Sequence, residues 1–238
     1  MYPSIQESAI LLEAENLMKD LMAKYDPSHD AFHVQRVRRT SLALANALSP
    51  KPDLFVVELA ALLHDILDKK YVSAEKAADP YGFFLPFFTA MAAKPDGLDL
   101  VQDGRARQIA QIIDNISWTT ESKLRKNNLW SEWHENCLEL HCVQDADRLD
   151  AIGAFGIMRC AAYSAAVNRP LYVPPNEPKV KASAIQIFHD RLLPVRDRLK
   201  TAPGRALGEK RHSVLVSFIA SVEEEYNNSI LAAEDPEL

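Results

Sequence analysis

Apolar residues recur at intervals of three and four along most of the chain, a spacing that places them on one face of an α-helix. The first such pattern follows Ser4 and Glu7, which have the spacing of a capping box, and it predicts a first helix that begins at Ser4. A second helix is predicted from about Asp30 to Leu48. Asp53 is a good N-cap for a third helix, LFVVELAALLHD, which is apolar nearly all round and is therefore expected at the centre of the fold.

The rest of the chain predicts further helices from less regular patterns. The aromatic segment YGFFLPFFTAM is interrupted by proline and predicts short helices that cover a pocket. Helices are also expected around Arg105–Ser117 and along a long stretch from about Ser131 to Val167. The segment RPLYVPPNEPKV is an expected loop, because proline cannot continue a helix, and two last helices are predicted near Ala182–Lys200 and Ala206–Asn227.

Composition supports a purely helical fold. The chain has 238 residues, of which only seven are glycine, and it is rich in Ala and Leu, which favours helices over a turn-rich sheet. No internal repeat, low-complexity segment or shift in composition marks a domain boundary. We therefore expect one all-α domain over residues 1–238.

The charge balance narrows the choice of partners. A net charge of −6 and an isoelectric point near 5.7 offer no basic surface for long nucleic acids, although a local cluster of Arg and Lys is compatible with a small anionic substrate. The three cysteines lack the spacing of a disulfide framework or a zinc knuckle. The chain has neither a signal-peptide pattern nor an apolar run of about 18 residues, so we expect a cytoplasmic protein with no membrane partner.

Ionisable side chains within apolar segments are the candidates for chemistry. His64 and Asp65 close an apolar run and are expected to be partly buried, where a carboxylate is costly unless it is paired or bound to a cation. In SHDAFHVQRV, His33 and Arg36 are three residues apart and share a helical face. Taken alone, His33 is more simply interpreted as a hydrogen-bonded structural side chain, and the His64–Asp65 pair is open to either interpretation.

Three acids, Asp145, Asp147 and Asp150, lie close together in the otherwise apolar segment VQDADRLDAIGAFGIMR. They would repel one another if all three were buried and unpaired. A cation or an arginine partner is therefore expected for at least one of them, and the spacing alone leaves open which one.

The order His…His-Asp…Asp on predicted helices resembles the HD superfamily of metal-dependent phosphohydrolases. The segments SHDAFHVQRV, ELAALLHDI, VQDADRLDAIGAFGIMR and TAPGRALGEKRHSVL are similar to one branch of small stand-alone HD hydrolases, so the resemblance extends from about residue 28 to about residue 217. It implies an HD-type helical bundle with a C-terminal helical extension. The metal-binding core is then expected at about residues 28–155 and the C-terminal helices at about 182–227.

The resemblance also implies the metal ligands. His33 is the first ligand, His64 and Asp65 are the pair that names the family, and Asp147 is the last. Asp147 is preferred because the family's final ligand usually lies in an Ala-Asp-basic-Leu context, which this chain matches; Asp145 is the competing choice. Leu67 stands where many HD proteins have glycine, a departure that affects backbone shape but not ligand identity.

Two imidazoles and two carboxylates form a mixed nitrogen and oxygen site. Such a site suits Mn²⁺, which we expect, and also Mg²⁺, Co²⁺, Ni²⁺, Fe²⁺ or Zn²⁺. One divalent ion is favoured, because the segment IIDNISW supplies no histidine where dinuclear members of the family commonly have one. The alternative is a second metal at His134 and His141, which are seven residues apart and could share a face.

Catalytic and phosphate-binding roles are assigned on the same resemblance. Asp68, one turn after His64, is the expected general acid or base; its alternative is a solvated acid paired with Lys69 or Lys70. Phosphoryl transfer also requires cations. Arg36 is the first candidate, with a role in catalysis and in substrate binding, and its alternative is a salt bridge that fixes an aspartate. The next candidates are Lys123 and Arg148.

The function that follows is hydrolysis of a phosphate ester or anhydride in a small phosphorylated substrate. The similar branch implies a nucleotide substrate, with cleavage of a nucleoside triphosphate to the monophosphate and pyrophosphate. The alternatives are a nucleoside 5′-monophosphate phosphatase and a metal-binding HD module without catalysis. An HD-fold oxygenase with two irons would need additional histidine ligands that the sequence does not place. The sequence leaves the oligomeric state open.

Overall fold

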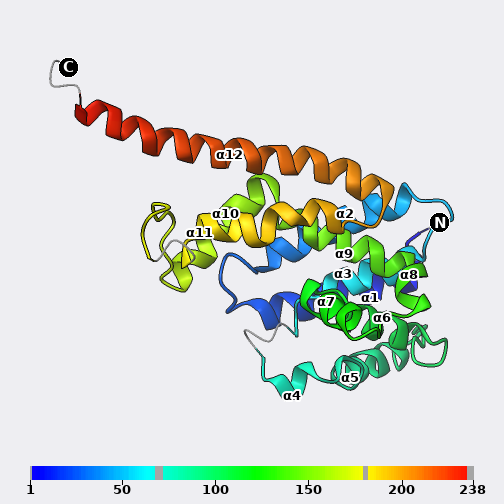
Figure 1. Ribbon diagram of the computed structural model, residues 1–238. Helices are drawn as coiled ribbons and strands as arrows, with labels where there is room; N and C mark the ends of the chain where they lie inside the picture. The colour runs from blue at the N-terminus through cyan, green and yellow to red at the C-terminus, as the bar shows by residue number, and fades with distance from the viewer. Residues whose placement is uncertain (1, 68–71, 179–181, 235–238) are drawn as a thin grey trace. The chain divides into compact units, whose positions relative to one another are not determined.

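Helices are the regular elements of this protein (Figure 1). The computed structural model describes residues 2–67, 72–178 and 182–234, and these ranges contain no β-strand, so the predicted all-α class is confirmed. No helix in them is long and apolar enough to cross a membrane. The chain divides into two compact units, Met1–Asp147 and Arg148–Leu238, with the division inside helix α9 (Leu138–Asp150). The expected single domain over residues 1–238 stays a prediction.

The first unit is built around helix α3 (Leu54–Leu63). This helix packs against α1 (Ile5–Met22), α2 (Ala31–Asn46) and α6 (Arg105–Asp114). Every residue of α3 from Phe55 to Leu63 is buried, so its predicted central place is confirmed. The other helices of this unit are α4 (Ala74–Ala77), α5 (Pro80–Ala92), α7 (Trp118–Lys126), α8 (Glu132–Asn136) and most of α9.

Local capping fixes the starts of the first three helices as predicted. The Ser4 hydroxyl accepts a bond from the backbone N–H of Glu7, and the Glu7 carboxylate accepts one from the N–H of Ser4. Asp30 caps α2 by accepting the N–H of His33 at 2.9 Å. Asp53 caps α3 through two backbone N–H groups. Caps of this kind stabilise a helix by about 1 kcal/mol each. The caps of α2 and α3 fix the starts of two helices that position candidate metal ligands.

The predicted helical stretch from about Ser131 to Val167 is helical, but it consists of three helices, α8, α9 and α10 (Gly153–Ala166), with breaks that the sequence did not predict. Cys137 separates the first two helices with an extended backbone, at ψ 96°. Gly153 has a φ of +75°, a left-handed conformation that glycine adopts without the penalty other residues incur. This turn separates α9 from α10.

The C-terminal boundaries also differ from prediction. Instead of one helix over Ala182–Lys200, the second unit has α11 (Ala184–Ile187), a π-helix at Phe188–Leu192 and a 3₁₀-helix at Leu193–Arg198. Pro194 explains the change of helix type, because it has no N–H to continue the α-helical bonds. The final helix, α12 (Ala202–Glu234), is longer than predicted at both ends.

Two further stretches of the first unit have helix boundaries that differ from the predicted ones. The segment predicted as short helices is one helix, α5, which holds Pro86 within it. The predicted helix at Arg105–Ser117 ends at Asp114, and Ser117 instead caps α7, which the sequence reading did not assign. Ser117 accepts the N–H of Thr120 at 3.0 Å.

A buried acid on the apolar helix α3 provides a test of this packing. Glu58 is only 5% exposed, and Arg38 of α2 donates to it from Nε at 2.7 Å while also contacting Glu15 of α1 at 2.8 Å. The Tyr2 hydroxyl donates to Glu58 as well. Arg38 therefore joins three elements of the unit through one side chain.

Replacing Arg38 with Ala should lower the free energy of unfolding by about 1–3 kcal/mol, because it leaves the Glu58 carboxylate buried without its cation. Arg39→Ala is the matched control, since the neighbouring Arg39 is exposed. Urea unfolding followed by circular dichroism measures both variants. Equal stability of the two variants would show that the Arg38–Glu58 pair is not needed to hold α2 on α3.

Candidate metal centre

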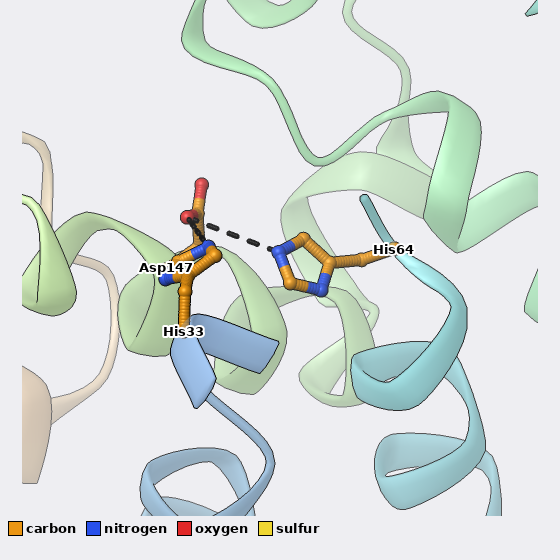
Figure 2. A group of neighbouring side chains, drawn as sticks. All are labelled: His33, His64 and Asp147. Carbon is orange, nitrogen blue, oxygen red and sulfur yellow. Dashed lines mark ion pairs between the residues drawn. The ribbon is translucent and has the colours of Figure 1, made fainter. Parts of the chain in front are cut away.

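Three helices of the first unit bring His33, His64 and Asp147 together (Figure 2). His33 is in the first turn of α2, His64 is the C-cap of α3, and Asp147 belongs to α9. One donor atom from each side chain lies within 4.8 Å of the other two. The three residues are far apart in the sequence, so the cluster depends on the packing of the unit.

Asp65 lies beside the same cluster. Its Oδ2 atom is 3.4 Å from Nε2 of His33 and 3.8 Å from Nε2 of His64. Oδ1 of Asp147 is 3.5 Å and 4.0 Å from the same two nitrogens. The imidazoles are 0% and 2% exposed, whereas the side chains of Asp65 and Asp147 are 18% and 31% exposed, so the cluster is open on its carboxylate side.

The backbone of α3 orients the His64 ring. Nδ1 of His64 lies 2.8 Å from the carbonyl oxygen of Ala61, and because a carbonyl can only accept, this nitrogen carries the proton in that bond. Nε2 then presents its lone pair to the cluster. Within the described part of the chain, neither this Nε2 nor Oδ2 of Asp65 has a hydrogen-bond partner, although both atoms are buried. Buried polar atoms of this kind normally have a partner.

The pKa of the Asp65 carboxyl is set by opposing effects. Burial raises it, but the positive charge that His64 and His33 carry when they are protonated lowers it more, with a smaller contribution from His29. The resulting pKa lies well below the usual range for aspartate. Asp65 is therefore a carboxylate at neutral pH, the form that binds a cation.

The donor set fits a divalent metal ion. Two neutral imidazole nitrogens and two carboxylates are ligands that borderline divalent cations accept. The inward-facing, buried lone pair of His64 and the unsatisfied Oδ2 of Asp65 would both gain a partner from such an ion. The bond from His64 Nδ1 to a backbone carbonyl is the usual second contact of a metal-binding histidine.

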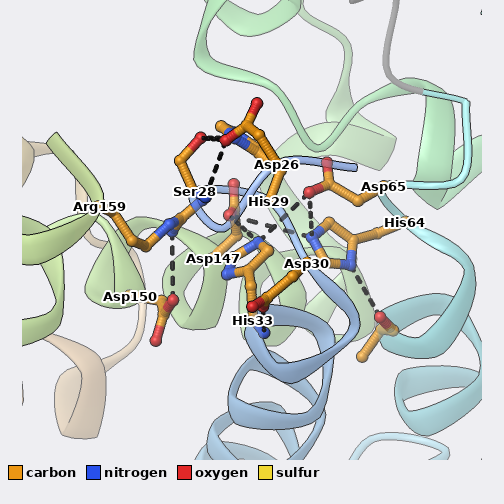
Figure 3. A network of polar contacts seen from close by, with 11 residues as sticks. Asp26, Ser28, His29, Asp30, His33, His64, Asp65, Asp147, Asp150 and Arg159 are labelled. Atoms are coloured by element: carbon orange, nitrogen blue, oxygen red, sulfur yellow. Dashed lines mark hydrogen bonds and ion pairs between the residues drawn. The ribbon is translucent and has the colours of Figure 1, made fainter. Parts of the chain in front are cut away.

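The neighbouring acids have different surroundings. Asp145 is fully buried, at 0% exposure, and does not belong to the cluster that His33 and His64 form, whereas Asp147 does. In the second unit, Asp150 is paired with Arg159 at 3.2 Å, which confirms that at least one of the three acids has an arginine partner (Figure 3).

A polar turn before α2 was not assigned a role from the sequence. Oδ1 of Asp26 accepts from the backbone N–H and the hydroxyl of Ser28, at 2.8 and 2.5 Å (Figure 3). The Ser28 hydroxyl is also 2.8 Å from Nδ1 of His29, whose ring centroid is 6.0 Å from that of His33. The turn residues in YDPSHD were the available signal, because Asp and Ser commonly hydrogen-bond the backbone of their own turn.

A cavity of about 330 Å³ opens beside the cluster within the first unit. Its volume is at the lower end of the range for small-molecule sites. The candidate ligands His64, Asp65 and Asp147 form one part of its lining. The remaining lining residues come from the segment after α3, from α4 to α7 and from the segments between these helices: Leu67, Ala77, Pro80, Ile113, Asp114, Ile116, Ser117, Thr119 and Thr120.

The residues expected to handle protons and phosphate are not gathered in this lining. Asp68, with Lys69 and Lys70, lies outside the described residues. Arg36 is half-buried on α2 and Lys123 is exposed on α7, and neither is among the described residues that line the cavity. In the second unit, Arg148 donates to the carbonyl oxygen of Arg198 at 2.8 Å. The expected roles of all four side chains stay predictions.

The two histidines considered for a second metal make structural hydrogen bonds. Nε2 of His134 is 3.1 Å from the side-chain oxygen of Asn115, and its Nδ1 lies 2.8 Å from the Ser131 hydroxyl. Nε2 of His141 is 2.8 Å from the carbonyl oxygen of His134. These bonds join α8, α9 and the end of α6.

Comparisons with known proteins indicate a family that agrees with this arrangement of histidines and aspartates. The HD-domain family model matches residues 31–152 of the chain. YpgQ of Bacillus subtilis is 31% identical over 223 residues, which cover 90% of this chain and 94% of YpgQ. The crystal structure of YpgQ in complex with ADP covers 93% of this chain and 97% of its own, at 26% identity and a TM-score of 0.65.

Two further solved structures have similar folds. A protein of Lactobacillus plantarum has a TM-score of 0.71 at 27% identity, covering 96% of this chain and all of its own. An HD-superfamily hydrolase of Bacillus thuringiensis has a TM-score of 0.68 at 25% identity, covering 93% and 98%. The chain therefore belongs to the HD-domain family and shares its superfamily with that hydrolase.

Proposed function

We propose that this HD-superfamily hydrolase cleaves a phosphate ester or anhydride in a nucleotide, with one divalent metal ion held by His33, His64, Asp65 and Asp147. The observation that carries the proposal is the cluster of buried donor atoms that opens into a cavity of ligand size. The similar YpgQ structure contains ADP, which supports a nucleotide as the ligand.

The ligands divide the task of holding the ion. His33 and His64 supply nitrogen lone pairs from almost fully buried rings, and Ala61 holds the His64 ring in place. Asp65 and Asp147 supply negative charge on the open side of the cluster. Mn²⁺ is the ion that we propose. A divalent ion in such a site polarises a phosphate group and lowers the pKa of water.

Proton transfer and phosphate binding are assigned to neighbouring side chains. Asp68 follows His64 by four residues in the sequence, a spacing that suits a general acid or base near the metal ligands. Arg36 follows His33 by three residues on α2 and has the planar guanidinium that binds phosphate oxygens in pairs. Lys123 and Arg148 are the further candidates for phosphate binding.

The proposed reaction converts a nucleoside triphosphate to the monophosphate and pyrophosphate. It is preferred over removal of a single phosphate from a nucleoside monophosphate because the ligand of YpgQ carries a phosphoanhydride bond. The two reactions release different products, and that difference gives a direct test.

The purified protein should hydrolyse nucleoside triphosphates only when a divalent ion such as Mn²⁺ is added. Chromatography of the nucleotide product, together with separate assays for phosphate and pyrophosphate, identifies the bond that breaks. Asp65→Ala should lose both the bound metal and the activity while its circular dichroism stays helical, because Asp65 faces both histidines. Turnover that survives metal removal, or that is unchanged in Asp65→Ala, would contradict the proposed centre.

Asp147→Asn should weaken Mn²⁺ binding far more than Asp145→Asn. Asp147 places a carboxylate oxygen within 4.0 Å of both imidazole nitrogens and belongs to the cluster that could hold an ion. Electron paramagnetic resonance of free Mn²⁺ measures the affinity directly, and the two variants control each other because both neutralise one acid of α9. The opposite order of effects would move the fourth ligand to Asp145.

Asp68→Asn should retain Mn²⁺ and nucleotide binding but lower kcat by about 10²–10⁴-fold, the usual contribution of general acid–base catalysis. The amide keeps the size of the side chain but cannot exchange a proton at neutral pH. Steady-state kinetics, with Mn²⁺ affinity measured on the same sample, separates chemistry from metal binding. A nearly unchanged kcat would return Asp68 to a structural role at the helix end.

A further inference from the structure

The described lining of the cavity carries negative charge, which by itself does not favour an anionic substrate. Its lining includes the carboxylates of Asp65, Asp114 and Asp147, and none of the described lining residues is Lys or Arg. A phosphate group that enters this cavity therefore needs positive charge or hydrogen-bond donors from other groups. A bound divalent ion supplies part of that charge, and the start of α7 supplies donors.

Helix α7 begins at the cavity wall. Its N-cap Ser117 and the first-turn residues Thr119 and Thr120 all line the cavity. The first turn of a helix exposes backbone N–H groups and carries a partial positive charge, both of which favour an anion. The acidic residue of this turn, Glu121, does not take the place of an anion at the start of the helix. Glu121 is buried, and its carboxylate accepts a hydrogen bond from Arg125 at 2.9 Å.

The hydrogen bonds of this turn leave a defined set of donors. Ser117 is engaged with Thr120, since its hydroxyl accepts the Thr120 N–H at 3.0 Å and donates to the Thr120 hydroxyl at 2.9 Å. The Thr120 hydroxyl accepts in that contact and so retains its own proton. Within the described chain, the backbone N–H and hydroxyl of Thr119 make no hydrogen bond, and Thr119 is exposed.

A separate observation points to a ligand in this cavity. The His64 side chain is only 2% exposed, lines the same cavity, and has an Nε2 atom without a hydrogen-bond partner in the described structure. Its orientation is fixed by α3 and owes nothing to α7. The cavity thus has a buried nitrogen lone pair without a partner in one part of its lining and hydrogen-bond donors of α7 in another.

We propose that the start of α7 is an anion subsite that holds a phosphate group of the substrate through the backbone N–H and hydroxyl of Thr119 and the hydroxyl of Thr120. The inference rests on the proposed function and extends it, because it assigns recognition of phosphate to residues outside the metal ligands. The ligand class is a nucleoside polyphosphate or pyrophosphate. The apolar lining residues, such as Ile113 and Ile116, are left to contact the nucleoside.

The test compares Thr119→Val, Thr119→Asp and a control, Ser122→Asp. Val keeps the shape of Thr but removes the hydroxyl, whereas Asp places a negative charge where phosphate would bind. Ser122 is exposed on the same helix and is not among the lining residues, so its variant adds the same charge elsewhere. Calorimetry with the Mn²⁺-loaded full chain measures the affinities for ADP and for inorganic pyrophosphate, and Mn²⁺ binding is measured separately.

Thr119→Val should weaken both ADP and pyrophosphate by about tenfold, the equivalent of one hydrogen bond to a charged group. Thr119→Asp should weaken both more strongly and yet not lower the melting temperature, because an acid in the first turn stabilises a helix. Ser122→Asp should bind both probes as the unmodified protein does. Mn²⁺ affinity should not fall in any of the three variants.

Each other result overturns the subsite in a distinct way. Unchanged affinities in Thr119→Asp, in a protein that still hydrolyses nucleotides, would remove the subsite and leave the proposed function intact. Weaker ADP binding with unchanged pyrophosphate binding would assign Thr119 to the nucleoside. Loss of Mn²⁺ from Thr119→Val would make α7 a support of the metal centre. An unmodified protein that holds Mn²⁺ but neither binds nor cleaves nucleotides or pyrophosphate would overturn the subsite and the proposed function together.

Discussion

The structure of the first unit depends on burying α3, a helix whose apolar surface extends nearly all the way round. Burial of every residue from Phe55 to Leu63 requires helices on several sides, and α1, α2 and α6 provide them. The same packing carries His64 and Asp65 into the interior at the end of α3, beside His33 of α2. Hydrophobic burial, which is the larger energy, thus holds polar donor atoms where protein partners are scarce.

The parts of the fold that sequence predicts well are those decided by neighbouring residues. Ser4 and Asp53 cap the helices that they were expected to cap, and Asp30 caps the helix that was predicted to begin there, because a cap needs only its own side chain and the next turn. The break at Gly153 was missed, since composition does not distinguish a glycine within a helix from one with a φ of +75°. Helix α7 was missed because WTTESKLRK has almost no apolar periodicity to detect.

The site was only partly accessible from the sequence. The resemblance placed His33, His64 and Asp147 together, and the structure brings these three side chains within reach of one ion. Spacing alone cannot choose between Asp145 and Asp147. Residues two positions apart in a helix point in directions about 200° apart around its axis, so the choice depends on which side of α9 faces the histidines. The part of the cavity lining that Thr119 and its neighbours form could not be predicted from the sequence, because the cavity arises where distant segments of the chain meet.

The spread of the donor residues over α2, α3 and α9 has a thermodynamic consequence. An ion that binds the folded cluster joins segments that are independent in the unfolded chain, so it favours only the native state. Folding and metal loading then become one linked equilibrium, in which the concentration of free ion sets part of the stability. For this chain, the supply of metal in its surroundings would act on the lifetime of the folded protein as well as on its chemistry.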